Sequence, residues 1–310
     1  VVKSVLSSFT GSIPDTGKSA EMIRQALQTL IVDRKLAGTV EYTLTDTGHL
    51  FRVGGVPLNI CTLHFPGSQT VPERKLIETT KSSTDLNYSR QAAMTFPKYG
   101  LFPLYREVGH LKASFGAPVA KPDKTPGCEG GVDLTIPVNE GLVYSWSKAD
   151  WRGNQIFSPN DLENALGMKV GEVANGKKFD RGLKDVETLY GTKGRIEARF
   201  NAEPDFDDAA QRVTFRIGVT EGPEYRMAAV EFKGFSDEDA EALKQRWQLG
   251  VGAVYDESYS GRFMREDGAP VFARIIRSRQ AQGKPVPNVT VKGTPNRQTL
   301  TVGVTIEMKN

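Results

Sequence analysis

Two stretches of this sequence repeat each other at a fixed distance, and this repetition constrains the fold more than any single motif does. The pattern Val-x-Glu-Gly-x-x-Tyr occurs at 138–144 and again at 219–225, 81 residues later. At the same spacing, Trp-Arg-Gly at 151–153 corresponds to Phe-Lys-Gly at 232–234. Matches at two places with one spacing and no gap indicate duplication of a structural unit. We therefore expect an array of similar domains.

A second repeated pattern has a closely similar spacing. Tyr-x-x-x-Gly, followed by alternating apolar residues, occurs at 105–115 and again at 190–200, 85 residues later. The chain has room for about four units of roughly 80 to 90 residues each, and the first unit is incomplete. The expected domains are a partial unit at 1–56 and full units at 57–141, 142–222 and 223–310.

The unit at 142–222 contains two predicted helices. Ser158 and Pro159 have the residue types of a helix N-cap and first turn, and apolar residues follow at helical spacing until Gly171. A second helix is predicted from about 178 to 190. It ends before Gly194, where a left-handed glycine suits a helix C-terminus.

Three segments of the same unit have the composition and alternation of strands. The first is 143–152, and the other two, 195–202 and 213–219, are expected to form a hairpin. With this element order, the first and third strands run parallel. The predicted fold class is α+β, with tandem β-α-α-β-β modules. Each module is a three-stranded mixed sheet covered on one face by two antiparallel helices.

The same order of elements is predicted for the last unit, and part of it for the first. The last unit has a strand at 227–233, a helix from Ser236 to Trp247, a second helix within 258–279 and a hairpin of 286–292 with 300–306. The first unit keeps a helix at 20–36 and a hairpin of 40–44 with 50–53.

Composition argues against several classes of protein. The chain has 40 basic and 37 acidic residues with both signs interspersed, unlike the concentrated basic surface of a nucleic-acid-binding protein. It has no apolar run of about 18 residues that would predict a membrane span. The first residues lack a signal-peptide pattern, which suggests either a cytosolic protein or a processed chain. The strand-like segment 300–308 near the end suggests that the chain is part of a longer protein.

The polar motifs predict structural roles. Glu140-Gly141 and Glu221-Gly222 lie where one unit meets the next. Glycine permits a turn there that few residues tolerate, and we expect the glutamate to bond neighbouring backbone or to set the angle between units. His49, His64 and His110 lack metal-ligand spacing, and no phosphate loop or Gly-x-Ser-x-Gly motif occurs. We expect no enzyme activity, catalytic residue, metal or cofactor.

The units resemble the POTRA (polypeptide-transport-associated) domains of outer-membrane assembly and secretion proteins. The resemblance rests on the β-α-α-β-β order and on the Val-x-Glu-Gly-x-x-Tyr pattern at 138–144 and 219–225. It rests also on the segments 150–154 and 230–234 that follow these patterns. It covers nearly the whole chain and is strongest from residue 132 onwards.

The resemblance implies a location in the bacterial periplasm, attached to the outer membrane through a barrel that this chain lacks. The implied function is that of the polypeptide-binding and docking region of a BamA-like assembly factor, which receives unfolded barrel precursors by strand addition. The implied partners are unfolded outer-membrane or secreted polypeptides and accessory periplasmic proteins or lipoproteins. A two-partner secretion transporter and a structural envelope scaffold are the alternatives. Phe235 and the segment 65–68 depart from the family pattern, whereas several tandem copies favour the assembly branch.

In POTRA domains the second strand of a module forms an open sheet edge, so the resemblance implies that an extended peptide adds there as a further strand. The expected edge residues are Leu111, Lys112, Ala113, Arg195, Ile196, Glu197, Ala198, Arg199, Asn288, Val289, Thr290, Val291 and Lys292. The expected junction residues are Glu140, Gly141, Tyr144, Glu221, Gly222 and Tyr225.

Cys61 and Cys128 are the two cysteines of the chain, too few for a disulfide framework and without CxxC metal spacing. By themselves they are either a disulfide or two unrelated buried thiols. In the implied fold, they lie near the starts of the first and third strands of one module, which would be parallel neighbours. We therefore expect a disulfide, which a Cα separation above about 7 Å would exclude.

Overall fold

The structure is a computed structural model that describes residues 16–33, 38–54, 58–128 and 130–309. The chain divides into two compact units. Unit 1 consists of Val1–Tyr105 and Lys112–Gly141, and unit 2 consists of Arg106–Leu111 and Leu142–Asn310.

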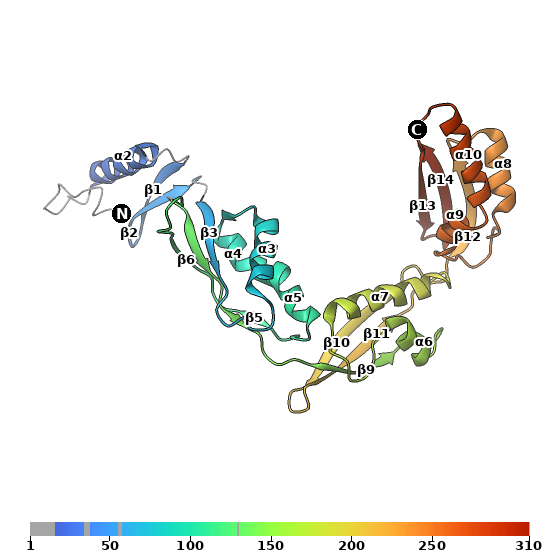
Figure 1. The fold of residues 1–310 in the computed structure, drawn as a ribbon, viewed down its shortest axis with the longest axis horizontal. Helices are drawn as coiled ribbons and strands as arrows, with labels where there is room; N and C mark the ends of the chain where they lie inside the picture. The colour runs from blue at the N-terminus through green and yellow to red at the C-terminus, as the bar shows by residue number, and fades with distance from the viewer. Residues whose placement is uncertain (1–15, 34–37, 55–57, 129, 310) are drawn as a thin grey trace. The chain divides into compact units, whose positions relative to one another are not determined.

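The first described elements of unit 1 are a helix and a hairpin (Figure 1). They are α2 (Gly17–Asp33), β1 (Thr39–Thr45) and β2 (Gly48–Gly54). Leu27 and Ile31 of α2 pack on Val40 of β1, because these apolar residues share one face of the helix. The predicted end of this helix at Leu36 lies outside the described residues, as does the predicted domain boundary between 56 and 57.

The rest of unit 1 contains a four-stranded sheet in the order β4-β3-β7-β6. Strands β3 and β7 are parallel neighbours, and β6 is antiparallel to β7. The strands are β3 (Leu58–His64), β4 (Asn87–Tyr88), β6 (Val119–Pro122) and β7 (Val132–Thr135), with a separate short pair β5 (Ser114–Phe115) and β8 (Val138–Asn139). The helices are α3 (Glu73–Thr84), α4 (Arg90–Phe96), the π-helix η1 (Pro97–Leu101) and α5 (Phe102–Glu107).

Unit 2 begins with a three-stranded sheet in the order β10-β11-β9. The third strand in sequence, β11, is central, antiparallel to β10 and parallel to β9. The elements are β9 (Ser145–Arg152), α6 (Pro159–Leu166), α7 (Gly176–Gly191), β10 (Arg199–Asp207) and β11 (Arg212–Thr220). Alternate residues of β11 are buried, so its apolar positions supply the core beneath the helices.

The remainder of unit 2 repeats this arrangement with the sheet order β12-β14-β13. β14 is central, parallel to β12 and antiparallel to β13, and the helices lie on one side of the sheet (Figure 1). The elements are β12 (Arg226–Lys233), α8 (Asp237–Arg246), α9 (Tyr259–Arg265), α10 (Ala269–Ala281), β13 (Asn288–Asn296) and β14 (Thr301–Lys309). The predicted α+β class with mixed sheets is confirmed. The prediction of three strands and two helices in every module is wrong, because the short strand β4 adds a fourth strand in unit 1 and the second helix of 223–310 is divided into α9 and α10.

Two helix boundaries differ from the prediction. Ser158 does cap α6 through a capping box with Asp161, but the helix ends at Leu166, because Gly167 rather than Gly171 adopts the left-handed conformation that terminates it. The helix predicted within 258–279 is two helices, and Pro270 lies in the first turn of the second one.

Each part of unit 2 has its own core. The core of 142–222 centres on Phe215, whose ring stacks with those of Trp146 and Phe179. The core of 223–310 centres on Phe263 beneath Trp247. Among the described residues, no helix combines the length and apolar composition that a membrane span requires.

Candidate functional site

The hairpin strands β10 and β13 lie at the outer edges of their sheets. Each bonds to the central strand on one side, and no other described strand pairs with its outer side. Such an edge presents backbone N–H and C=O groups that a further extended chain can bond. These two edges are the candidate site in unit 2.

The predicted edge residues Asn288 to Lys292 lie within β13. Val289 packs partly against the core of 223–310, and Val291 is 40% exposed. Asn288, Thr290 and Lys292 alternate with these valines and therefore face the other side of the sheet. The segment combines an apolar and a polar face along one open edge.

The predicted edge at Arg195 to Ala198 is wrong, because β10 begins only at Arg199. A turn follows Gly194, closed by a hydrogen bond from the Ala198 N–H to the Arg195 carbonyl. Ile196 packs against the core of 223–310, whereas Ala198 is buried in the core of 142–222. The alternation that resembles a strand therefore arises from two apolar residues that face two different cores.

The predicted edge at Leu111 to Ala113 is wrong for the same reason. These residues form a turn, and strand pairing begins at Ser114. Leu111 packs against the core of 142–222, as its counterpart Ile196 packs against the core of 223–310. The outer strands of the main sheet in unit 1 are β4 and β6, and neither was predicted as an edge from the sequence.

The junction residues Tyr144 and Tyr225 form the same backbone contacts, 81 residues apart. The Tyr144 N–H donates to the Gly109 carbonyl over 3.0 Å, and the Tyr225 N–H donates to the Gly194 carbonyl over 2.9 Å. Both tyrosine side chains are buried. The repeated sequence therefore builds a repeated joint, with a left-handed glycine on one side and a buried tyrosine on the other.

The junction glutamates bind backbone amides of the loop after the first strand of their own module. Glu221 Oε1 accepts from the N–H groups of Gln155 and Ile156 at 2.7 and 2.9 Å. Glu140 Oε1 accepts from the N–H groups of Gln69 and Thr70, both at 2.8 Å. Each carboxylate thus ties the last strand of a module to the loop that leads into its first helix.

The environment of Glu221 favours its charged form. Burial by itself would raise the pKa of Glu221, but the hydrogen bonds from Ile156, Gln155 and Tyr190 outweigh it and hold the pKa below the ordinary 4.5. Burial and the neighbouring Glu221 charge raise the pKa of Tyr190, which therefore stays a neutral donor. The pair provides a fixed hydrogen bond and no group that titrates near neutral pH.

Gly141 and Gly222, which follow these glutamates, both adopt left-handed conformations with φ of 67° and 70°. A Cβ on Gly222 would lie 3.3 Å from the backbone of Glu197, so the chain is close-packed there. Conformation and space both favour glycine at this point.

A groove in unit 1 was not predicted from the sequence. It has a volume of about 410 Å³ and lies between η1 and the residues Ala113 to Phe115. Tyr99 and Met94 line it and are 72% and 59% exposed. Lys98 lies 5.5 Å from the centre of the Tyr99 ring. The signal that the sequence did offer is the concentration of aromatic and proline residues in 96–103.

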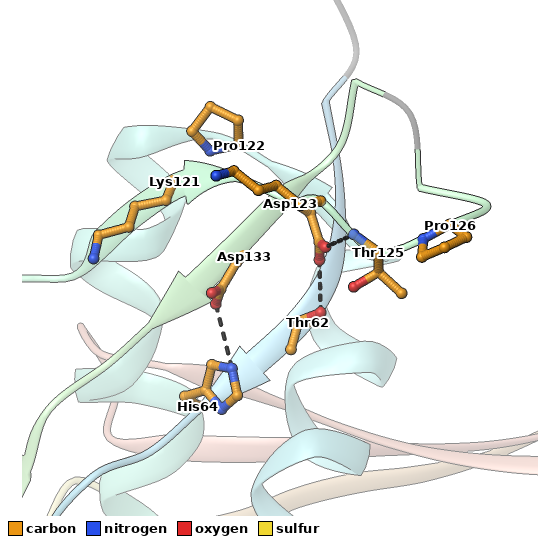
Figure 2. A pocket seen from close by; sticks show the side chains of 9 residues that line it. Thr62, His64, Lys121, Pro122, Asp123, Thr125, Pro126 and Asp133 are labelled. Carbon is orange, nitrogen blue, oxygen red and sulfur yellow. Dashed lines mark hydrogen bonds and ion pairs between the residues drawn. The ribbon is translucent and has the colours of Figure 1, made fainter.

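A second, polar pocket of about 580 Å³ lies beside β3, β6 and β7 of unit 1 (Figure 2). Asp123 accepts hydrogen bonds from the Thr62 hydroxyl at 2.6 Å and from the Thr125 N–H at 2.8 Å. Hydrogen bonds from Thr125 and Thr62 lower the pKa of Asp123. His64 Nε2 lies 3.5 Å from Asp133 Oδ1. The Asp123 carboxylate thus has protein partners on both of its oxygens, which suits a role in holding the adjacent loop.

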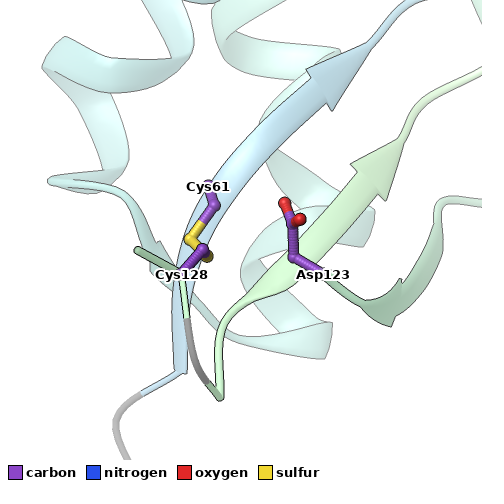
Figure 3. A group of neighbouring side chains, drawn as sticks. All are labelled: Cys61, Asp123 and Cys128. Carbon is purple, nitrogen blue, oxygen red and sulfur yellow. A yellow bond between two sulfur atoms is a disulfide. The ribbon is translucent and has the colours of Figure 1, made fainter. Parts of the chain in front are cut away.

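Cys61 and Cys128 are joined by a disulfide, with their Cα atoms 6.2 Å apart (Figure 3). Asp123 lies beside them, and the three side chains could form a metal-ligand set. A metal needs thiolates, however, and the two sulfurs are bonded to each other here. In this form the bond connects β3 to the loop before β7.

The comparison with protein families identifies one of the repeated units. Residues 144–222 match the POTRA family, described as the surface antigen variable number repeat. That stretch is a POTRA domain. The resemblance recognised in the sequence is thus confirmed, and the β9-α6-α7-β10-β11 order is the POTRA order in this chain.

Two curated relatives are similar to this chain over more than half of its length. The protein named "Putative outer membrane protein assembly factor" of Treponema pallidum is 26% identical over 170 residues, which cover 54% of this chain and 20% of that protein. Outer membrane protein assembly factor BamA of Neisseria meningitidis serogroup B is 22% identical over 233 residues, covering 72% of this chain and 28% of that protein. The chain thus matches less than a third of the length of either relative.

Among solved structures, the POTRA3-5 region of Haemophilus influenzae BamA is similar with a TM-score of 0.54 and 20% identity. The match covers 83% of this chain and 98% of that structure. The POTRA fold therefore extends well beyond residues 144–222. Both curated relatives are named as outer membrane protein assembly factors.

Proposed function

We propose that this chain is the polypeptide-binding and docking region of an outer-membrane protein assembly factor, located in the periplasm and attached to the outer membrane through a barrel. It receives unfolded barrel precursors by strand addition. The observation that carries the proposal is the open outer edge of a hairpin strand in both sheets of unit 2.

Strand addition suits a receptor for many different clients. Main-chain hydrogen bonds supply the affinity and do not depend on the client's sequence, whereas flanking pockets accept alternate side chains. In unit 1, the groove beside Ala113 to Phe115 offers such a pocket, with Tyr99 and Met94 as apolar contacts. An unfolded precursor segment can supply both the extended backbone and the apolar side chains.

The whole array has a scaffolding and docking role in addition to strand addition. The modules at 1–56, 57–141, 142–222 and 223–310 act as a scaffold that binds and does not catalyse, without a cofactor. Accessory periplasmic proteins or lipoproteins dock on the same array. The relatives that carry "assembly factor" in their names support this role.

Peptide binding followed by NMR chemical shifts tests the proposal. The probes are extended peptides from strands of several unrelated outer-membrane barrels, titrated to millimolar concentration into the full chain. We expect shifts along an outer strand of unit 2 and around Tyr99. Absence of shifts with every peptide would contradict the proposal. Binding of one dedicated secreted partner alone would favour a two-partner secretion transporter.

A matched pair of variants separates binding from folding. Tyr99→Ala should weaken binding at the groove at least threefold without changing the fold, because the side chain is 72% exposed. Val170→Ala removes another exposed apolar side chain, 81% exposed and on the loop between α6 and α7, and should leave binding unchanged. Equal effects of the two changes would argue against the groove.

A further inference from the structure

In each of the three sheets with more than two strands, the outer hairpin strand contains a proline. Pro122 lies in β6, Pro204 in β10 and Pro295 in β13. Proline has no N–H, so its effect depends on whether its nitrogen faces the sheet or the open side. The orientation follows from the pairing of the central strands.

In the sheet of 223–310, the nitrogen of Pro295 faces outward. The Leu300 carbonyl accepts from the Arg226 N–H at the start of β12, and the Met308 carbonyl lies against Gly234 at its end. Backbone groups of alternate residues point to the same side of a strand. The even-numbered residues of β14 therefore bond β12. Val302, which pairs with Pro295, is one of them, so its backbone groups point away from β13. Pro295 is thus in a pair without hydrogen bonds, and its nitrogen points to the open side.

The sheet of 142–222 gives the same result for Pro204. The Gln211 carbonyl accepts from the Ser145 N–H, and the Val219 carbonyl lies against Gly153 after β9. Odd-numbered residues of β11 therefore bond β9. Since Pro204 pairs with Phe215, its nitrogen also faces the open side.

In unit 1 the orientation rests on hydrogen bonds of the segment that continues β7. The Ile136 N–H donates to the His64 carbonyl over 2.8 Å, so even-numbered residues bond on the β3 side. Pro122 pairs with Val132 and faces outward. Pro118 lies just before β6 and, like Pro122, has an even number. The outward-facing residue Ala120 therefore lies between two prolines.

The three edges consequently differ in how many successive N–H groups they offer outward. β6 offers one, from Ala120, and β10 offers two before its proline, from Phe200 and Ala202. β13 offers three, from Val289, Val291 and Gly293. Each outward residue can exchange two hydrogen bonds with an added antiparallel strand, so β13 has the longest uninterrupted edge.

We propose that, of these three hairpin edges, the segment Asn288 to Gly293 of β13 is the one that accepts an added strand, and that the outward prolines close the edges of β6 and β10. This inference rests on the proposed function and specifies where it takes place. Prolines on edge strands are a known protection against unwanted strand pairing. Here they select one receiving edge in an array of similar sheets.

The occupant is an extended segment of about six residues with apolar side chains at alternate positions. Val289 and Val291 line the helix-covered side, where Val289 packs on the core. The opposite side carries Lys292, which is exposed and has no ion-pair partner among the described residues. We therefore assign an acidic residue to the occupant opposite Lys292, on its polar face.

The test uses the full chain with isotope labelling and a ten-residue peptide of alternating valine and threonine that contains one central glutamate. Shifts should concentrate on Asn288 to Gly293. Val291→Pro removes the middle outward donor without removing a bond to β14, and should weaken binding at least tenfold. A peptide N-methylated at alternate residues should fail to bind.

Pro204→Ala gives an independent readout that does not depend on the fold of the Val291→Pro chain. It restores an outward donor in β10 and should produce new shifts on Phe200 to Phe206. Equal shifts on β10 and β13 in the unmodified chain, or no gain with Pro204→Ala, would overturn the inference and leave the proposed function standing. Absence of any shift in all chains would overturn both.

Discussion

The phenol of Tyr190 donates a hydrogen bond to the carboxylate of Glu221 over 3.1 Å, and thereby connects the end of α7 to the end of the last strand of the same module. A related arrangement exists in unit 1, where the Tyr105 hydroxyl donates to Ser68 Oγ over 2.7 Å and Ser68 Oγ lies 3.5 Å from Glu140 Oε1. The half-buried glutamate is therefore the point at which the helix, the sheet and the first loop of a module meet.

Glu221→Ala should lower the stability of the module at 142–222 by about 2 kcal/mol, because it leaves two backbone N–H groups and the Tyr190 hydroxyl without their acceptor. Denaturation in a Trp247→Phe background measures this change, since Trp146 and Trp151 then report on this module alone. The control is Glu163→Ala on the exposed side of α6, which should change stability by less than about 0.5 kcal/mol. Equal effects would show that Glu221 has no special role.

The stability of the same module should fall on acidification, and the sign follows from the depressed pKa of Glu221. A carboxylate whose pKa is lower in the folded state stabilises that state above its unfolded pKa of about 4.5 and loses this contribution as the pH falls through the folded pKa. We expect the denaturation midpoint to decline below pH 4.5. Glu221→Gln should be less stable at pH 7 and flatter in this range. Parallel curves for the two proteins would exclude Glu221 as the cause.

Removal of the disulfide should destabilise unit 1. The bond joins residues that are 67 apart in sequence, and closing a loop of this size contributes about 4 kcal/mol by the chain-entropy model. Hydrogen exchange at Ile60 and Leu134, on neighbouring strands, should speed up after reduction and in the Cys61→Ser, Cys128→Ser double variant. Exchange in β14 of unit 2 serves as the internal control and should not change. Unchanged exchange at Ile60 would contradict the prediction.

Gly194→Ala should disrupt the joint between 142–222 and 223–310. Gly194 has a φ of 70°, and a Cβ there would lie only 2.5 Å from the Tyr225 carbonyl oxygen. Gly167→Ala is the matched control, because Gly167 has a φ of 69° but a Cβ there would come no closer than 3.9 Å to another group. The control should lose about 1 kcal/mol from backbone strain alone, and Gly194→Ala should lose clearly more. Equal losses in denaturation experiments would show that the close approach is unimportant.

The order of elements could be predicted from the sequence because each boundary has a local cause. Ser158 and Asp161 complete a capping box from four consecutive residues. The alternation of Val213 to Val219 corresponds to a strand with one buried face. Such signals depend on neighbours in sequence, so they need no knowledge of the tertiary structure.

The edge strands could be predicted only in part, because an edge is a property of the whole sheet. Ile196 and Ala198 alternate with charged residues as a strand would, yet they serve two cores in a turn. The direction of the Pro204 and Pro295 nitrogens depends on the partner strand and is invisible in the sequence. The groove at Tyr99 requires the π-helix, whose register no simple periodicity indicates.

The joint between Gly194 and Tyr225 uses backbone atoms, and its counterpart between Gly109 and Tyr144 uses the same atoms. A module that carries both residues uses its tyrosine to bond the preceding module and its glycine to bond the following one. A duplicated copy inserted at such a joint would meet compatible neighbours on both sides, and a deletion there would rejoin them. Gene duplication can therefore lengthen or shorten the array in whole modules, without the compensating substitutions that a single shared core would demand.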